Sequence, residues 1–180
     1  MRVSHDADTA STDDAPLATD ALLEANRAYA DAFDGADLPV KPSLRVAIVA
    51  CMDCRLDVSA LLGLENGQAH VIRNAGGVVT DDVIRSLCLS QRALGTREIV
   101  LVHHTGCGLA TVTEDGFRAD LADEVGVTPP WPVEAFEDPY VDVRRSIRRL
   151  EGSPFVPLTD HVRGFVYDVA TGRLDEVEPD

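Results

Sequence analysis

Apolar, strand-forming residues gather in three short runs between residues 44 and 108. The runs are LRVAIVAC at 44–51, AHVIRNAGG at 69–77 and REIVLVHHTGCG at 97–108. The first is nearly continuous, which is typical of a strand covered on both faces, as in a parallel sheet. The second and third each end in a glycine turn. We therefore expect three strands here, with the first fully buried.

Segments with the helical spacing of apolar residues lie between and around these runs. Thr80 or Asp81 is a suitable N-cap for the helix that follows the second strand, whose apolar stripe begins at Val83. A strand, a turn at Thr171-Gly172 and a short strand close the chain over residues 164–177. Helices are predicted at 19–33, 55–64, 80–95, 114–124 and 140–151.

The alternation of strands and helices predicts an α/β fold with a mainly parallel central β-sheet flanked by helices. A length of 180 residues suits one domain. Residues 1–18 are rich in Asp, Ser, Thr and Ala and have little to bury, so we expect a disordered acidic tail. We assign residues 19–180 to a single domain.

The charge of the chain argues against two classes of partner. The formal net charge is −15, and such a field repels both nucleic acid and anionic membranes. No apolar run reaches the roughly 20 residues of a membrane span, and the polar start of the chain lacks the apolar core of a secretory signal. We therefore expect a cytoplasmic protein whose partners are neither nucleic acid nor membranes.

The acidic residues are biased toward Asp, with 21 Asp against 10 Glu, and the basic residues toward Arg, with 15 Arg against a single Lys. An Asp-rich, Lys-poor surface is typical of proteins that function in concentrated salt, where the screening length between like charges is about 3 Å rather than about 10 Å. Codon bias in a GC-rich genome explains the same composition equally well. Both explanations stay open.

Cysteines stand at the ends of two predicted strands, and sites in parallel sheets form at such ends. Cys51 and Cys54 form a Cys-x-x-Cys, which is one form of a redox pair. However, Asp53 between them disfavours a thiolate, and a redox pair leaves the second group, His104 and Cys107, without a role. The redox interpretation is therefore the weaker one.

The alternative is a zinc site. Tetrahedral zinc takes cysteine sulfur, histidine nitrogen and carboxylate oxygen, and catalytic sites keep one position for water. His104-x-x-Cys107 lies in a tight turn where two ligands converge, and Cys51 from the neighbouring strand supplies a third. His103 points to the opposite face of the strand, so it is expected to pack or hydrogen-bond beside the site. The fourth position is left for water or Asp53.

The segments ACMDCR, VIRNAGG and HTGCG together resemble the β-class carbonic anhydrases, in detail over about residues 45–109. The resemblance implies that Cys51, His104 and Cys107 bind one zinc ion per chain. It also implies that Asp53 and Arg55, of the Cys-x-Asp-x-Arg motif, form a catalytic dyad. The Cys-x-x-Cys is then an accident of sequence, because the family usually has Ser or Ala at position 54.

The activity implied by the resemblance is the reversible hydration of CO2 to bicarbonate and a proton by a zinc-bound hydroxide. Asp53 would orient the nucleophile, and Arg55 would hold Asp53 ionised and in position. Backbone N–H groups near Gly108 would polarise the substrate. Asp53 would also bind zinc as a fourth ligand in a closed state of the site.

The resemblance implies further features. Members are homodimers or larger homo-oligomers, and the helix at 19–33 resembles the N-terminal arm that reaches the partner subunit. The final strand, around 164–169, would extend the sheet at its edge. Some members hold the closed state with bicarbonate in a side pocket; Arg73 matches the arginine of that pocket, but its Trp is replaced by Ile48.

Two other functions stay open at this point. The chain resembles the compact branch of the family, which also contains enzymes that hydrolyse carbonyl sulfide or carbon disulfide, and the same zinc ligands serve either reaction. A non-catalytic zinc-binding or redox module is the more remote alternative. The presence of both Asp53 and Arg55 argues against a purely structural zinc site, which needs neither residue.

Overall fold

The computed structural model describes residues 17–178. The predicted acidic tail at 1–18 therefore lies outside the described residues, except for its last two. The chain divides into two compact units, with the boundary along the sequence between Asp37 and Leu38. Each unit is described by itself. Among the described residues, none of the helices is both long and apolar enough to span a membrane.

The first unit contains one described helix, α1 (Ala18–Asp31), which confirms the helix predicted at 19–33. None of its residues is buried. Large apolar side chains on and just after this helix are more than half or nearly half exposed: Leu22, Leu23, Tyr29 and Phe33. The helix therefore carries an apolar stripe that the described residues of the first unit leave uncovered.

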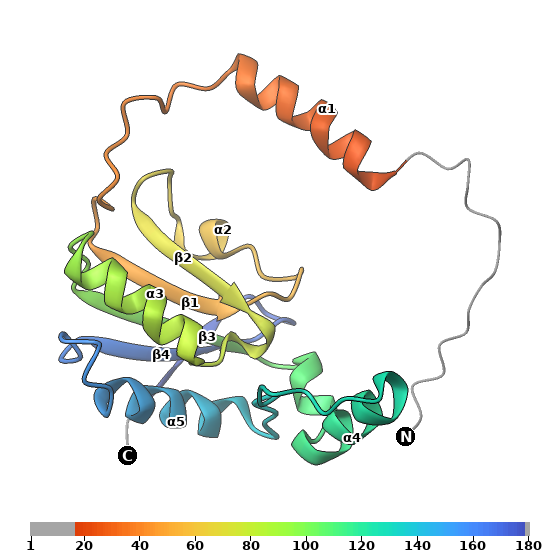
Figure 1. The fold of residues 1–180 in the computed structure, drawn as a ribbon. Helices are drawn as coiled ribbons and strands as arrows, with labels where there is room; N and C mark the ends of the chain where they lie inside the picture. Colours follow the sequence, from red (N-terminus) through yellow and green to blue (C-terminus); the bar gives the residue numbers. More distant parts are fainter. Residues whose placement is uncertain (1–16, 179–180) are drawn as a thin grey trace. The chain divides into compact units, whose positions relative to one another are not determined.

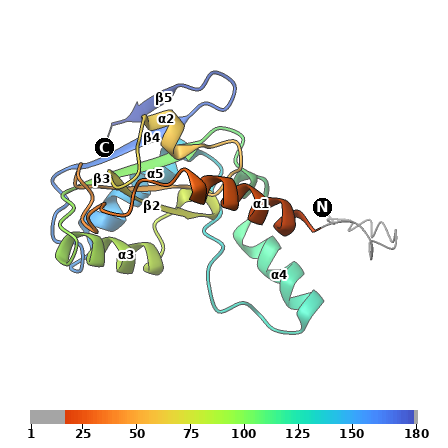
Figure 2. The ribbon, with the colours of Figure 1, turned by 90° about the horizontal axis from the view of Figure 1, so that it is seen from above.

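The second unit is built on one five-stranded sheet in the order β2-β1-β3-β4-β5. Figure 1 labels the first four strands of this order, and Figure 2 labels β5. The first four strands in this order are parallel and β5 is antiparallel to β4. This confirms the mainly parallel α/β fold. The bounds are β1 (Val46–Cys51), β2 (Ala69–Asn74), β3 (Glu98–His104), β4 (Val162–Tyr167) and β5 (Leu174–Val177).

One expectation about the sheet is wrong. The strand expected around 164–169 as the edge is β4, and it lies between β3 and β5. The turn after β4 reverses the chain at Gly172, which has a positive φ of 74° that glycine adopts without strain. This reversal pairs β5 with the open side of β4, so β5 becomes the edge.

The helices of the second unit follow the predicted order. Thr80 caps α3, because its hydroxyl accepts a hydrogen bond from the N–H of Val83. Two short 3-10 turns, η1 (Ala75–Gly77) and η2 (Gly108–Thr111), follow β2 and β3. The helices are α2 (Val58–Leu62), α3 (Asp81–Arg92), α4 (Glu114–Val125) and α5 (Pro139–Glu151).

The sheet has a separate apolar core on each face, as the alternation of side chains along a strand requires. On one face α3 and α5 pack against the strands, and Leu87 and Leu150 are fully buried there. On the other face α2 and the segments after β1 and β3 cover Ile48 and Val102. Figure 2 shows α2 and α3 on opposite sides of the sheet.

Close packing at the carboxyl ends of β1 and β3 depends on a glycine of the NAGG turn. Gly77 has a φ of +72°, and a Cβ on it would lie 2.8 Å from the Cys51 nitrogen and 3.0 Å from the Val102 oxygen. Both of these neighbours are backbone atoms and cannot turn aside. Only glycine therefore lets the turn after β2 approach the end of β1, where Cys51 leaves the sheet.

Candidate metal centre

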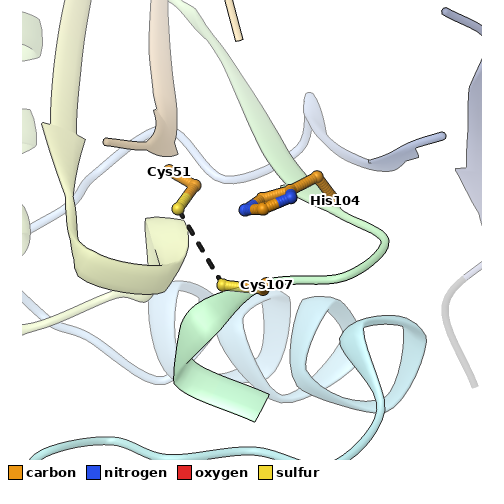
Figure 3. Close-up of side chains that lie close together, drawn as sticks. All are labelled: Cys51, His104 and Cys107. Atoms are coloured by element: carbon orange, nitrogen blue, oxygen red, sulfur yellow. Dashed lines mark hydrogen bonds between the residues drawn. The ribbon is translucent and has the colours of Figure 1, made fainter. Parts of the chain in front are cut away.

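Three buried side chains meet at the carboxyl ends of β1 and β3. The sulfur atoms of Cys51 and Cys107 and a ring nitrogen of His104 all lie within 4.8 Å of one another. The two sulfur atoms are 4.0 Å apart, and the three side chains point toward one another (Figure 3). Cys51 and His104 end adjacent parallel strands, and the tight turn through Gly106 brings Cys107 back beside them. The structure thus brings together the three residues that the sequence singled out as metal ligands.

The ring of His104 is held in the orientation that a metal ligand needs. Its Nδ1 lies 3.0 Å from the carbonyl oxygen of Thr105, to which it donates a hydrogen bond. Its Nε2 is buried and has no hydrogen-bond partner among the described residues. With the proton on Nδ1, the lone pair of Nε2 faces the two sulfur atoms. A histidine ligand is typically fixed in this way by a hydrogen bond from its other nitrogen.

The two sulfur atoms do not titrate alike. The hydrogen bond from Cys107, helped by His104, lowers the pKa of Cys51 to about 4 against the opposing effect of burial. The same contact with Cys51, together with burial, raises the pKa of Cys107. Burial is the largest single effect on His104 and lowers its pKa, but the nearby Cys51 sulfur, the Thr105 carbonyl and the Asp53 charge together raise the pKa overall. The site therefore already favours one thiolate.

The carboxylate of Asp53 lies beside this group, with Oδ2 3.7 Å from His104 Nε2. Arg55 binds it through Nε and Nη2, and the Arg55 backbone N–H donates to Oδ1 at 2.9 Å. These hydrogen bonds hold the pKa of Asp53 well below its usual range. Arg55 Nη2 also donates to the Gly106 carbonyl at 2.9 Å, which ties the pair to the turn that carries Cys107.

A mostly apolar pocket of about 570 Å³ opens onto Cys51, Asp53 and Cys107. Gly108, the predicted substrate-binding residue, lies on its wall. The motif segments ACMDCR and VIRNAGG contribute Met52, Asn74, Ala75 and Gly76 to the lining, although the sequence assigned these residues no role. Sequence reasoning missed the part of the wall that comes from the segment after the metal-binding turn, because that segment carries no motif. The residues missed there are Leu109, Val112, Phe117, Trp131, Pro132 and Val133.

The structure confirms the prediction that His103 packs beside the site, and it also places Cys54. His103 is fully buried and faces α5, where its Nε2 lies 2.9 Å from Asp142 Oδ2. It therefore points away from His104 and is not part of the metal-binding group. Cys54 is exposed, whereas Cys51 is buried and its sulfur lies 4.0 Å from that of Cys107. Cys51 thus belongs to the group with Cys107 and His104, as the zinc interpretation expects.

Comparison with known proteins places these features in one family. A family profile described as carbonic anhydrase matches residues 46–132. The chain is 58% identical over 161 residues to β-carbonic anhydrase 1 from Mycobacterium tuberculosis, covering 89% of this chain and 98% of that protein. The chain belongs to the β-carbonic anhydrase family.

Solved structures and more distant relatives agree with this assignment to the β-carbonic anhydrases. A carbonic anhydrase structure from Streptococcus mutans superimposes with a TM-score of 0.85 at 47% identity, covering 91% of this chain and 99% of that one. A carbon disulfide hydrolase from Acidithiobacillus thiooxidans is 33% identical over 151 residues, covering 72% of this chain and 75% of that protein. The fold is therefore shared between relatives of two named activities.

Zinc, the cofactor of β-carbonic anhydrases, fits the donors that this chain presents. Two sulfur atoms and one imidazole nitrogen form a three-ligand set that zinc accepts, with a fourth position available for water. The unpartnered Nε2 of His104 is the kind of buried polar atom that a metal ion satisfies. All three donors are already buried in the folded protein, so metal binding requires little further desolvation of these side chains.

Proposed function

We propose that this protein catalyses the reversible hydration of CO2 to bicarbonate and a proton, with one zinc ion per chain. The observation that carries the proposal is the buried group of Cys51, His104 and Cys107 beside the Asp53–Arg55 pair at one end of an apolar pocket. Neither the metal-binding group nor the Asp53–Arg55 pair alone specifies the reaction. Together they provide a metal site, a fixed carboxylate and a chamber suited to a small apolar substrate.

Cys51, His104 and Cys107 would hold the metal in this proposal. When bound, zinc lowers the pKa of a coordinated water from 15.7 to roughly 7, so that the water becomes a nucleophile near neutral pH. The thiolate character of Cys51 offsets part of the zinc charge. The hydrogen bond from His104 to the Thr105 carbonyl keeps the ring in place.

Asp53 would accept a hydrogen bond from the nucleophile and so orient it toward the substrate carbon. The bidentate contact with Arg55 keeps this carboxylate ionised, because it lowers the pKa of Asp53. Only 16% of the Asp53 side chain is exposed, against 49% for Arg55. The carboxylate thus faces the protein while its partner reaches solvent. In the alternative closed state, Asp53 would leave Arg55 and bind the metal as a fourth ligand.

The pocket wall would supply the substrate site. CO2 carries no charge, and apolar side chains such as Val112 and Phe117 hold it without competing water. The backbone at Gly108 borders the same space and would polarise a substrate oxygen. The reaction therefore needs no charged substrate-binding residue in the pocket.

Stopped-flow CO2 hydration on the zinc-loaded protein at mildly alkaline pH tests the proposal, with zinc counted per chain and carbonyl sulfide and carbon disulfide assayed in parallel. Fast CO2 hydration with about one zinc per chain is the expected result. Slow hydration with fast sulfide release would instead assign the protein to sulfur heterocumulenes, for which the apolar pocket is also suited. Absence of both activities with zinc bound would leave a non-catalytic zinc-binding protein.

We further propose a homodimer or larger homo-oligomer in the cytoplasm. The uncovered apolar stripe of α1 supports self-association, because Leu22 is 68% and Leu23 53% exposed. Light scattering on the full chain and on a Leu22→Asp, Leu23→Asp double variant tests the assembly. The double variant is expected to have the smaller mass, and equal masses would exclude α1 from the interface.

A further inference from the structure

The guanidinium of Arg73 binds the backbone on which the proposed active site is built. Arg73 lies on β2, opposite Ala50 in the parallel register with β1. Its Nε and Nη2 donate to the Cys51 carbonyl at 3.0 and 2.8 Å. Its Nη2 also donates to the Asp53 carbonyl at 2.7 Å. One side chain thus joins the residue that carries a metal-binding sulfur to the residue that carries the dyad carboxylate.

These contacts matter because the backbone leaves regular structure at this point. Cys51 is the last residue of β1, and no strand or helix includes Met52 or Asp53. The Met52 N–H donates to the Asn74 carbonyl at 2.8 Å, which continues the strand pairing by one bond. Beyond it, the Asp53 carbonyl is held by Arg73 and by the Leu56 N–H at 3.0 Å. Hydrogen bonds from a charged donor are roughly twice as strong as neutral ones, so Arg73 is a main restraint on this segment.

Asp53 is therefore held at both of its ends by arginines. Arg55 fixes the carboxylate, and Arg73 fixes the carbonyl of the same residue. A carboxylate that must orient a nucleophile needs its backbone as well as its side chain in place, because small displacements cost much of the rate. Arg73 is not among the residues that line the pocket, so it would act through the backbone that it binds and not through contact with the substrate.

The same contacts argue against an anion-binding role for Arg73. Three of its five N–H groups point to the Cys51 and Asp53 carbonyls, which leaves only the two N–H groups of Nη1. The two carbonyl oxygens on that edge of the guanidinium would repel an anion. The residue at position 48 is the fully buried Ile48, which offers no donor.

We infer that Arg73 is a positioning residue: it sets the path of the Cys51–Asp53 backbone and thereby aims the Asp53 carboxylate. This inference rests on the proposed function. It assigns Arg73 no contact with the substrate, the metal or the nucleophile. It predicts a loss in kcat at nearly unchanged KM for CO2, because the apolar side chains proposed to hold CO2, such as Val112 and Phe117, come from other segments of the pocket wall.

Arg73→Ala tests the inference, with Arg163→Ala as the matched control. Arg163 is also a strand arginine, but it pairs with Glu176 at the surface, away from the pocket. We expect kcat of Arg73→Ala to fall about 10- to 100-fold with zinc still near one per chain, and kcat of the control to stay at the wild-type value. Guanidinium ion at non-denaturing concentration should restore part of the lost kcat, whereas equal concentrations of urea or sodium chloride should not.

Arg73→Lys covers the case in which the alanine variant does not fold. A lysine keeps the charge, but its single ammonium group cannot reproduce the forked donors with which the guanidinium binds two carbonyl groups. We therefore expect a kcat between those of the wild type and Arg73→Ala, with about one zinc per chain. Three results would overturn the inference: wild-type kcat in both variants, lost activity that follows lost zinc and is not rescued, or intact activity with altered bicarbonate inhibition. Failure of the wild-type protein to hydrate CO2 would instead refute the proposed function.

Discussion

Arg55 donates hydrogen bonds to both carboxylate oxygens of Asp53, from Nε to Oδ1 at 2.9 Å and from Nη2 to Oδ2 at 2.7 Å. The fork of the guanidinium matches the carboxylate in a way that a single ammonium group cannot. Because Arg55 also binds the Gly106 carbonyl, the pair connects the segment after β1 with the turn after β3. The two halves of the proposed metal site are thus coupled through one salt bridge.

Replacing Arg55 with Ala is expected to lower kcat, because the Asp53 carboxylate loses the two side-chain hydrogen bonds that aim it. The pKa of Asp53 should rise, since the Arg55 side chain is the first cause of its low value, but the Arg55 backbone N–H and His104 still lower it, so the carboxylate stays ionised near neutral pH. The freed carboxylate would also be able to take the metal position of the water, so kcat should fall more near pH 7 than at alkaline pH. A pH profile of kcat measures both effects. A wild-type profile in the variant would mean that Arg55 does not position Asp53.

Substitution of Cys51 and of Cys54 should have opposite effects on the zinc content. Cys51→Ser is expected to lose most of the bound zinc, because it removes one of three buried donors. Cys54→Ser is the matched control: it removes an exposed sulfur three residues away and should keep both zinc and activity. Metal analysis of the two purified variants decides the question. Loss of zinc from Cys54→Ser alone would reverse the ligand assignment.

Zinc removal should also lower thermal stability. A ligand that binds only the folded state at a thousandfold excess over its Kd adds about 4 kcal/mol to the free energy of unfolding. We therefore expect the melting temperature to fall when a chelator removes the metal and to recover when zinc is restored. The Cys51→Ser variant should show no such response. Scanning calorimetry of both proteins with zinc, with chelator and after zinc is restored checks both statements.

Substitution of Gly77 should destabilise the fold through its close contact with the end of β1. A methyl group at Gly77 would meet the Cys51 nitrogen and force a backbone shift, in addition to the strain of a positive φ. We expect Gly77→Ala to lower the free energy of unfolding by about 3 kcal/mol. Gly95→Ala carries similar φ strain but meets no atom within 4 Å, so it should cost only about 1–2 kcal/mol. Urea denaturation of both variants isolates the cost of the close contact.

The net charge of −15 predicts that stability rises with ionic strength. Repulsion among the acidic groups opposes the compact state, and salt shortens its range from about 10 Å at 0.1 M to about 3 Å at 1 M. The melting temperature should therefore increase as sodium chloride is added. Full stability in dilute buffer would show that the Asp bias reflects codon usage and not adaptation to salt.

The sequence predicted the sheet and the metal-binding group because both depend on local signals. Apolar strands, glycine turns and helix caps such as Thr80 are short-range patterns that the fold keeps. The convergence of Cys51 with His104 follows from one rule, that parallel strands present their carboxyl ends at the same edge. The placement of Arg55 against Asp53 follows from their two-residue spacing.

Other features depend on contacts that no local pattern records. Trp131 and Phe117 reach the pocket from a segment after β3, and their placement is set by long-range packing. Glu114 helps to fix that segment, since its carboxylate accepts the N–H groups of Val133 and Glu134. Arg73 could be matched to a motif, but its binding to two carbonyls depends on strand register and side-chain reach. The position of β5, rather than β4, at the edge of the sheet likewise depends on the turn at Gly172.

The only tryptophan of the chain is Trp131, and it stands on the wall of the pocket. Its side chain is about half exposed, at 51%. Indole emission depends on the polarity around the ring, so any molecule that fills the pocket should change both its intensity and its wavelength. The protein thus carries a built-in optical probe of its own site, through which the binding of inhibitors could be titrated without a label or a turnover assay.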